Sequence, residues 1–196
     1  MNGKGFVITL EHNLRPVTPA DREALGLLWE EAFEASQEDF LPLLAIADIQ
    51  VLVYEKDGRL CGMATVVPVT VGTVGGVYLY GICIQKDFRG QGLFRSLMKD
   101  LESSSAMGGA EFCCLIPGDD GLSRTYESFG YTVPITLFSP TANGHPVSCQ
   151  SKAFLDAVAP SNPIGDAEFP CAGRLKRLDS VTLPNDLYFT SPMGEI

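Results

Sequence analysis

The sequence has few of the residues that metal sites and nucleic-acid surfaces need. Only two histidines occur among its 196 residues, and none of the six cysteines belongs to a C-x-x-C pair, so no metal site is expected. The formal net charge of -10 argues against nucleic acid as a partner and disfavours binding to anionic lipid. Acidic surfaces keep many proteins soluble, and they also attract cationic molecules such as amines.

Long charge-free segments are also scarce, and the main one does not have the composition of a membrane helix. No charged residue occurs between Arg59 and Lys86, which is long enough to span a bilayer. However, the segment contains several glycines and Pro68, and β-branched residues dominate the rest, so two buried strands with a Gly-rich connection fit better. The apolar run Phe6–Leu10 is too short for a secretory signal. We therefore expect a cytoplasmic protein without membrane contact.

The hydrophobic pattern predicts an alternation of helices and strands up to residue 138. The segment 18–21 (Thr-Pro-Ala-Asp) has the residue types of a helix start, and Asp-Gly within 56–59 is typical of a hairpin turn. The expected order is a strand ending near 16–17, helices at 18–33 and 40–46, strands at 49–54, 60–71 and 77–84, a helix at 90–103, a strand at 111–116, a helix at 119–129 and a strand at 131–138.

The composition changes after residue 138. Residues 139–196 are rich in Pro, Gly, Ser and Asn, with one helical run at 152–158 and strand-like pieces at 174–178 and 187–190. We therefore expect one domain over residues 1–138 and a C-terminal extension over residues 139–196 that packs on the same domain.

The segment 77–97 carries the main chemical signal. A hydrophobic strand is followed by Arg-Gly-Gln-Gly at 89–92, where a helix is expected to begin. Unpaired N–H groups and the positive dipole end of a helix can hold a phosphate, and glycine lets the anion approach the backbone. Flanking basic residues supply the positive charge that the whole chain lacks: Lys86, Arg89, Arg95 and Lys99.

Two common phosphate-binding motifs do not fit this segment. A P-loop requires G-x-x-x-x-G-K-[ST], which is absent, and a dinucleotide-binding fingerprint requires a third glycine where Arg95 stands.

The segment 89–93 instead resembles the [QR]-x-x-G-x-[GA] motif of the GNAT superfamily of acyl-CoA-dependent N-acetyltransferases. Phe94 departs from the motif, because a small residue is usual at its position. The segment 125–131 also resembles the Y-E-x-x-G-[FY] end of the family's fourth helix, and the two motifs occur in the family's order. The resemblance implies a mixed α/β (α+β) GNAT fold, with a mostly antiparallel central sheet of about six to seven strands flanked by helices.

The resemblance further implies that acetyl-CoA is the cofactor and that its acetyl group passes to a primary amine of a small molecule or protein. Backbone amides at 91–95 would hold the CoA pyrophosphate, and the end of the fourth strand would pair with the pantetheine arm. The cofactor-binding residues expected on this basis are Ile82, Cys83, Ile84, Arg89, Gly90, Gln91, Gly92, Leu93, Phe94 and Arg95.

Tyr126 matches the family's general acid, because a phenol can give a proton to the thiolate that leaves; the alternative is a core tyrosine. The amide of Ile84 is the expected oxyanion donor. Trp29 and Tyr80 are candidate acceptor contacts, although Trp29 also suits a core role, and Asp119 either contacts CoA or caps a helix. The expected fourth strand has no carboxylate, which leaves these candidates for a base besides a water chain: Glu30, Glu31, Glu34, Asp39, Tyr78 and Tyr80.

Two readings of a different class stay open from the sequence. One is a GNAT-fold module that binds acyl-CoA as a sensor or assembly partner without turnover, which the missing strand carboxylate and Phe94 allow. The other is a nucleotide-binding domain. The identity of the acceptor and the existence of a homodimer are not determined by the sequence.

Overall fold

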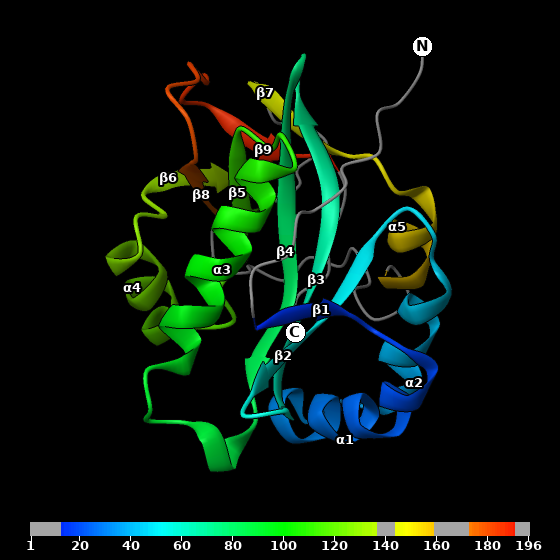
Figure 1. The fold of residues 1–196 in the computed structure, drawn as a ribbon. Coiled ribbons are helices and arrows are strands. Elements are labelled where there is room, and N and C mark those ends of the chain that lie inside the picture. Colours follow the sequence, from blue (N-terminus) through cyan, green and yellow to red (C-terminus); the bar gives the residue numbers. More distant parts are fainter. Residues whose placement is uncertain (1–12, 137–143, 159–172, 191–196) are drawn as a thin grey trace.

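The computed structural model describes residues 13–136, 144–158 and 173–190. Within them a nine-stranded mixed sheet has helices on both faces, with α3 and α4 on one side and α1, α2 and α5 on the other (Figure 1). The predicted α/β class, with a mostly antiparallel central sheet flanked by helices, is thereby confirmed. The apolar run at 6–10, the predicted strand end at 137–138 and Cys171 lie outside the described residues.

The first half of the chain supplies the longest strands. Its elements are β1 (Leu14–Pro16), η1 (Pro19–Asp21), α1 (Arg22–Phe33), α2 (Gln37–Phe40), η2 (Leu41–Ala45), β2 (Gln50–Lys56), β3 (Arg59–Val71) and β4 (Val74–Ile84). Asp57 and Gly58 make the tight turn between β2 and β3 with φ of 52° and 70°, as the Asp-Gly pair predicts. The helix expected at 40–46 is instead a short α-helix followed by a 3-10 turn, because Pro42 cannot continue an α-helix interior.

The second half supplies the helices of the opposite face and the remaining strands. Its elements are η3 (Lys86–Phe88), α3 (Leu93–Met107), β5 (Phe112–Leu115), α4 (Asp120–Ser128), β6 (Val133–Thr136), β7 (His145–Cys149), α5 (Lys152–Val158), β8 (Gly173–Arg177) and β9 (Leu187–Phe189).

The strands of the C-terminal extension are part of the central sheet. The strand order is β1-β2-β3-β4-β5-β8-β6-β9-β7, so β8 lies between β5 and β6. β7 also pairs with the end of β3, where Val69–Val71 lie opposite Val147–Cys149. The sheet therefore has more strands than the six to seven expected, because the extension contributes three of them.

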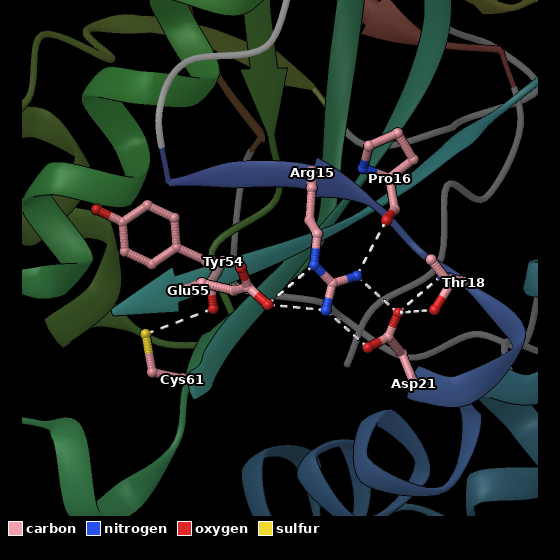
Figure 2. Close-up of polar contacts among 7 residues, drawn as sticks. All are labelled: Arg15, Pro16, Thr18, Asp21, Tyr54, Glu55 and Cys61. Atoms are coloured by element: carbon pink, nitrogen blue, oxygen red, sulfur yellow. Dashed lines mark hydrogen bonds and ion pairs between the residues drawn. The ribbon is translucent and has the colours of Figure 1, made fainter. Parts of the chain in front are cut away.

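An ion-pair network joins the first strand to the start of the first helix (Figure 2). Arg15 donates to both carboxylate oxygens of Asp21 at 2.7 and 2.8 Å, and also to Glu55 on β2 at 2.9 Å. The Asp21 carboxylate in turn accepts hydrogen bonds from the amide and the hydroxyl of Thr18, both at 2.7 Å. These contacts confirm the helix start that 18–21 predicts, and they fix α1 relative to β1 and β2.

A β-bulge interrupts β4 near its end. Tyr80 lies opposite Thr65 and Cys83 lies opposite Met63, so three steps along β4 match two along β3. The extra residue falls at 81–82, where Gly81 has a φ of +59°. Because of it, Tyr80 and Cys83 both face the α1 side of the sheet, although strict alternation would separate them.

Candidate functional site

A cleft of about 640 Å³ opens where β4 and β5 separate. The two parallel strands pair only between Gly76–Tyr78 and Phe112–Cys114. Beyond this point, residues 79–84 form one wall of the cleft, and the segment after β5 with α4 forms the other. The residues that line it are Ala32, Phe33, Glu34, Tyr78, Leu79, Tyr80, Gly81, Ile82, Cys83, Ile84, Arg89, Phe94, Leu115, Ile116, Gly118, Asp119, Leu122, Thr125 and Tyr126.

The Arg-Gly-Gln-Gly loop leads into the N-terminus of α3. Gly90 and Gly92 both have a φ of +76°, and Gly92 is the N-cap of the helix. This left-handed conformation favours glycine, and no atom lies within 4 Å of a Cβ added at either position. The amides at 93–95 begin the helix, where N–H groups lack acceptors within the helix. The loop thus offers an open approach to backbone donors at a positive helix end.

The end of β4 presents its backbone to the cleft. The amide of Gln85 donates to Cys61 on β3 at 2.8 Å. Because successive N–H groups of a strand point to opposite edges, the amide of Ile84 points away from β3, toward the cleft edge. The carbonyl of Ile84 points the same way and accepts a 2.9 Å hydrogen bond from Arg89 Nε. Arg89 therefore couples the glycine loop to the strand end.

Further contacts hold the loop from neighbouring elements. Lys56 of β2 donates to Gln91 Oε1 at 2.7 Å, and the Lys86 amide donates to Glu31 of α1 at 2.6 Å. Arg95 lies over the ring of Phe129, 4.5 Å from its centroid. Lys56 was not among the predicted residues, because the hairpin that carries it lies more than thirty positions earlier in the sequence.

Tyr126 reaches the cleft from α4 and is only 5% exposed. Its ring packs against Phe94 at 5.8 Å and Tyr131 at 5.9 Å between centroids. Burial, and secondarily the proximity of Cys83, raise the pKa of Tyr126 well above its ordinary value. The phenol therefore keeps its proton at neutral pH, as a proton donor must.

Cys83 also lines the cleft, but it is a poor nucleophile. Burial raises the pKa of its thiol to about 12, so the reactive thiolate is absent at neutral pH. The site thus favours direct attack by an acceptor over a covalent intermediate on this cysteine. Cys61, Cys113, Cys114 and Cys149 are free thiols too, and the described residues contain no group of three or more His, Cys, Asp or Glu side chains arranged for a metal ion.

The C-terminal end of α1 lines the cleft through Ala32, Phe33 and Glu34. Tyr80 also lines the cleft, whereas Trp29 is 2% exposed and lies in the core behind it, with ring centroids 5.9 Å apart. Trp29 packs on Phe40 at 5.0 Å, and its ring meets the backbone at Gly81. Of the two acceptor contacts considered from the sequence, the structure thus places Tyr80 in the cleft and Trp29 in the core.

The carboxylates considered as bases fall into separate environments. Glu31 accepts from the Lys86 amide, and Glu30 accepts from the Gln37 amide at 3.4 Å, so both have partners outside the cleft. Glu34 lines the cleft itself. Asp119 accepts from the Leu122 amide at 2.7 Å and is the N-cap of α4, which was one of its two predicted roles.

The wall formed by 115–125 was missed by sequence reasoning, apart from Asp119. The sequence offered one signal for this wall, the order strand, helix, strand over β4, α3 and β5. This order favours parallel strands, as the structure has them, so the residues after β5 reach the same edge of the sheet as the end of β4.

A model of the acetyltransferase (GNAT) domain family matches residues 13–133, more than half of the chain. The chain therefore belongs to the GNAT acetyltransferase family and is an acyltransferase by family. A comparison with curated protein sequences found no match.

Several solved structures share the fold. They include the GNAT family N-acetyltransferase YhbS of Escherichia coli in complex with CoA, with 18% identity, coverage of 92% of this chain and 89% of that chain, and a TM-score of 0.61. The ribosomal-protein-S18-alanine N-acetyltransferase of Escherichia coli has 14% identity, coverage of 86% and 95%, and a TM-score of 0.56. A GNAT family acetyltransferase of Elizabethkingia anophelis with acetyl-CoA bound has 14% identity, coverage of 85% and 99%, and a TM-score of 0.52. At these identities the likeness concerns the fold.

No helix in the described part of the chain combines the length and the apolar character needed to cross a membrane.

Proposed function

We propose that this protein transfers the acetyl group of acetyl-CoA to a primary amine of a small molecule or protein, with Tyr126 as general acid. The observation that carries the proposal is the cleft between β4 and β5, which is lined by Tyr126 and by Arg89 and Phe94, the residues that flank the glycine loop at the start of α3. The CoA and acetyl-CoA bound to the similar structures from Escherichia coli and Elizabethkingia anophelis support the choice of cofactor.

In this proposal the glycine loop and the end of β4 hold the cofactor. Backbone amides at 91–95 donate to the pyrophosphate, where the helix dipole of α3 and the Arg89 and Arg95 side chains add positive potential. The cleft edge of 82–84 offers backbone groups to the pantetheine arm, in the manner of an added strand. The Ile84 amide, which points to this edge, donates to the oxyanion of the tetrahedral intermediate.

The chemical step then needs one proton donor and one neutral amine. The amine nitrogen attacks the thioester carbon, a C–N bond forms and the C–S bond breaks. The leaving thiolate takes its proton from the Tyr126 hydroxyl. The attacking nitrogen, which is cationic in the tetrahedral intermediate, gives its extra proton to water or to a base, and the Tyr126 phenolate regains a proton from solvent, so the products are the neutral amide and the thiol. The high pKa of Cys83 agrees with direct attack, because that thiol cannot compete as a nucleophile at neutral pH.

The first test is a calorimetric titration of the purified protein with acetyl-CoA, with ATP as control. We expect micromolar binding of acetyl-CoA and none of ATP, followed by amine-dependent release of free thiol. Binding of ATP in place of acetyl-CoA would contradict the proposed cofactor. Binding of acetyl-CoA without thiol release over a broad set of amines would instead favour the module without turnover.

A further inference from the structure

The part of the cleft formed by the end of α1 carries a carboxylate in an unfavourable position. Glu34 ends α1 with a φ of 54° and a ψ of 25°, a left-handed conformation that glycine and asparagine adopt far more readily. A carboxylate is also disfavoured at the negative C-terminal end of a helix dipole. Among the described residues, no side chain or amide forms a hydrogen bond or ion pair with this carboxylate. The Glu34 side chain is exposed and lines the cleft, so its carboxylate is available to a bound molecule.

The cleft lining carries charge of both signs. Arg89 supplies a positive charge, and its Nε is hydrogen-bonded to the Ile84 carbonyl. The segment from Arg22 to Lys56, which includes Glu34, has no basic residue in between. The carboxylates between them are Glu23, Glu30, Glu31, Glu34, Glu38, Asp39, Asp48 and Glu55. Of these carboxylates Glu34 lines the cleft, so a cationic acceptor would meet a negative charge there that the basic residues of this segment do not neutralise.

Tyr80 adds a second polar group to the cleft lining. It is 7% exposed and lines the cleft, and its hydroxyl has no hydrogen-bond partner among the described residues. Burial, and secondarily the negative charge of Asp39, raise the pKa of Tyr80, so its phenol stays neutral and can accept from a cationic donor. The ring of Phe33, the residue before Glu34, also lines the cleft and can contact a cation through its face.

The chemistry decides which nitrogen Glu34 can bind. The nitrogen that attacks the thioester must be neutral, yet a nearby carboxylate favours the charged form of an amine. A contact between Glu34 and the reacting nitrogen would therefore oppose the reaction. A contact with a separate, non-reacting cation would position the acceptor without that cost.

We propose that the acceptor is an amine that carries a second positive charge, which Glu34 and the Tyr80 hydroxyl bind while the first nitrogen attacks acetyl-CoA. The inference rests on the proposed acetyltransferase function. During transfer the second cation keeps its proton, so the proton balance at the reacting nitrogen and at the thiolate is unchanged.

The test compares diamines with monoamines of equal chain length. Thiol release is measured with putrescine against butylamine, and with cadaverine against pentylamine, in the wild type, Glu34→Gln and Glu38→Gln. Glu38 is the matched control, because it is an exposed carboxylate on α2 outside the cleft lining. We expect the wild type to prefer the diamines, and Glu34→Gln to lower their kcat/KM roughly five-fold, mainly through KM. Glu34→Gln should affect monoamines much less than diamines, and Glu38→Gln should behave as the wild type with both.

The outcomes separate this inference from the function on which it rests. Turnover of monoamines and diamines with equal efficiency in the wild type, or an equal loss for both classes in Glu34→Gln, would overturn the inference and leave the acetyltransferase proposal intact. Binding of acetyl-CoA with no turnover of any amine would overturn both.

Discussion

The ring of Tyr126 makes its packing contacts with Phe94 and Tyr131, so its hydroxyl can be removed without loss of those contacts. We expect Tyr126→Phe to lower kcat about 100-fold, because general acid catalysis contributes at least that much, and to leave the affinity for acetyl-CoA nearly unchanged. Because burial raises the pKa of Tyr126, wild-type kcat should show no alkaline loss below about pH 10.

Tyr131→Phe is the control for this prediction, because Tyr131 packs on Tyr126 but lies outside the cleft lining. Steady-state kinetics of both variants, with calorimetry of acetyl-CoA binding, measure the difference. Equal kcat in Tyr126→Phe and wild type would exclude Tyr126 as the acid.

Replacement of Glu34 by glycine is expected to stabilise the fold. Glycine removes the cost of a left-handed residue and the unfavourable charge at the helix end, so Glu34→Gly should stabilise the fold by about 1 kcal/mol. That gain corresponds to a rise in Tm of roughly 2–4 °C for a chain of this size. Asp57→Gly is the comparison, because Asp57 is the other described non-glycine residue with positive φ and lies in a turn outside the cleft lining.

Asp57→Gly should raise Tm less, since aspartate tolerates this conformation better than glutamate. Thermal unfolding by circular dichroism measures both variants. A fall in Tm for Glu34→Gly would show that the Glu34 side chain stabilises the fold, contrary to the argument from its position.

The sequence identifies some site residues better than others. Gly90, Gly92 and Tyr126 are named by motifs, because the positive φ and the phosphate approach tie their chemistry to a fixed spacing. The special position of Glu34 could not be inferred, since nothing local marks it as the left-handed end of α1 rather than as a surface residue. Trp29 showed the reverse difficulty, because a buried aromatic and an aromatic that lines a cleft have the same helical periodicity.

At the scale of elements, the N-terminus of α3 and its loop form the anion site. Gly92→Asp would place a carboxylate beside the pyrophosphate, so we expect acetyl-CoA affinity to fall about 100-fold or more. Gly109→Asp is a close control. Gly109 also has a positive φ, of 90°, with open space around an added Cβ, but it lies after the C-terminal end of the same helix. Calorimetry should show normal binding in the control, and unchanged affinity in Gly92→Asp would remove the proposed pyrophosphate site.

The link between β1 and the start of α1 should depend on pH. Arg15, followed by the Thr18 hydrogen bonds, lowers the pKa of Asp21 well below its ordinary value. The folded state therefore disfavours the proton, so this contribution is present above about pH 4 and is lost as pH falls below it. The pair is partly exposed, so Asp21→Asn should cost only about 1 kcal/mol of unfolding free energy at neutral pH.

Urea unfolding of Asp21→Asn and wild type at neutral pH and near pH 3 measures this difference. The gap between the two proteins should narrow at the lower pH. A gap of the same size at both values would show that the charge of Asp21 does not contribute.

Most elements follow from local sequence, but their boundaries do not. The Asp-Gly turn and the capping residues at 18–21 were sufficient for the first hairpin and for α1. By contrast, α3 begins at Leu93 and not at Gly90, because the glycines take positive φ values and stay in the loop. The bulge in β4 had no clear signal, since a glycine within a strand also occurs where another group packs closely.

For the whole molecule, the C-terminal extension contributes strands to the interior of the sheet. β8 lies between β5 and β6, and β7 pairs with the long strand β3. We expect a chain that ends at residue 138 to lose cooperative unfolding, because β5 and β6 would then expose unpaired edges and the core would lose Leu175, Leu187 and Phe189. Thermal unfolding followed by circular dichroism measures this, with the full chain as reference. A cooperative transition and normal acetyl-CoA binding in the short chain would show that residues 1–138 form an independent domain.

This arrangement could not be read from the sequence. The strands at 173–177 and 187–189 have recognisable patterns, but pairing partners 38 to 65 residues away leave no local mark. The amino-acid composition changes at residue 138, but the hydrogen bonds of the sheet join the strands before and after that position.

The bulge in β4 makes the length of that strand part of the site. Cys83 and Ile84 lie opposite Met63 and Gly62 on β3, while Gly81–Ile82 hold one residue more than the facing stretch of β3. Loss of that residue would leave Cys83 opposite Met63 and on the same face as Tyr80, but it would remove the bend and the extra twist that the bulge gives the strand at the cleft edge. Insertions and deletions should therefore be far less tolerated between 79 and 84 than in the turn at 72–73, even where substitutions are accepted.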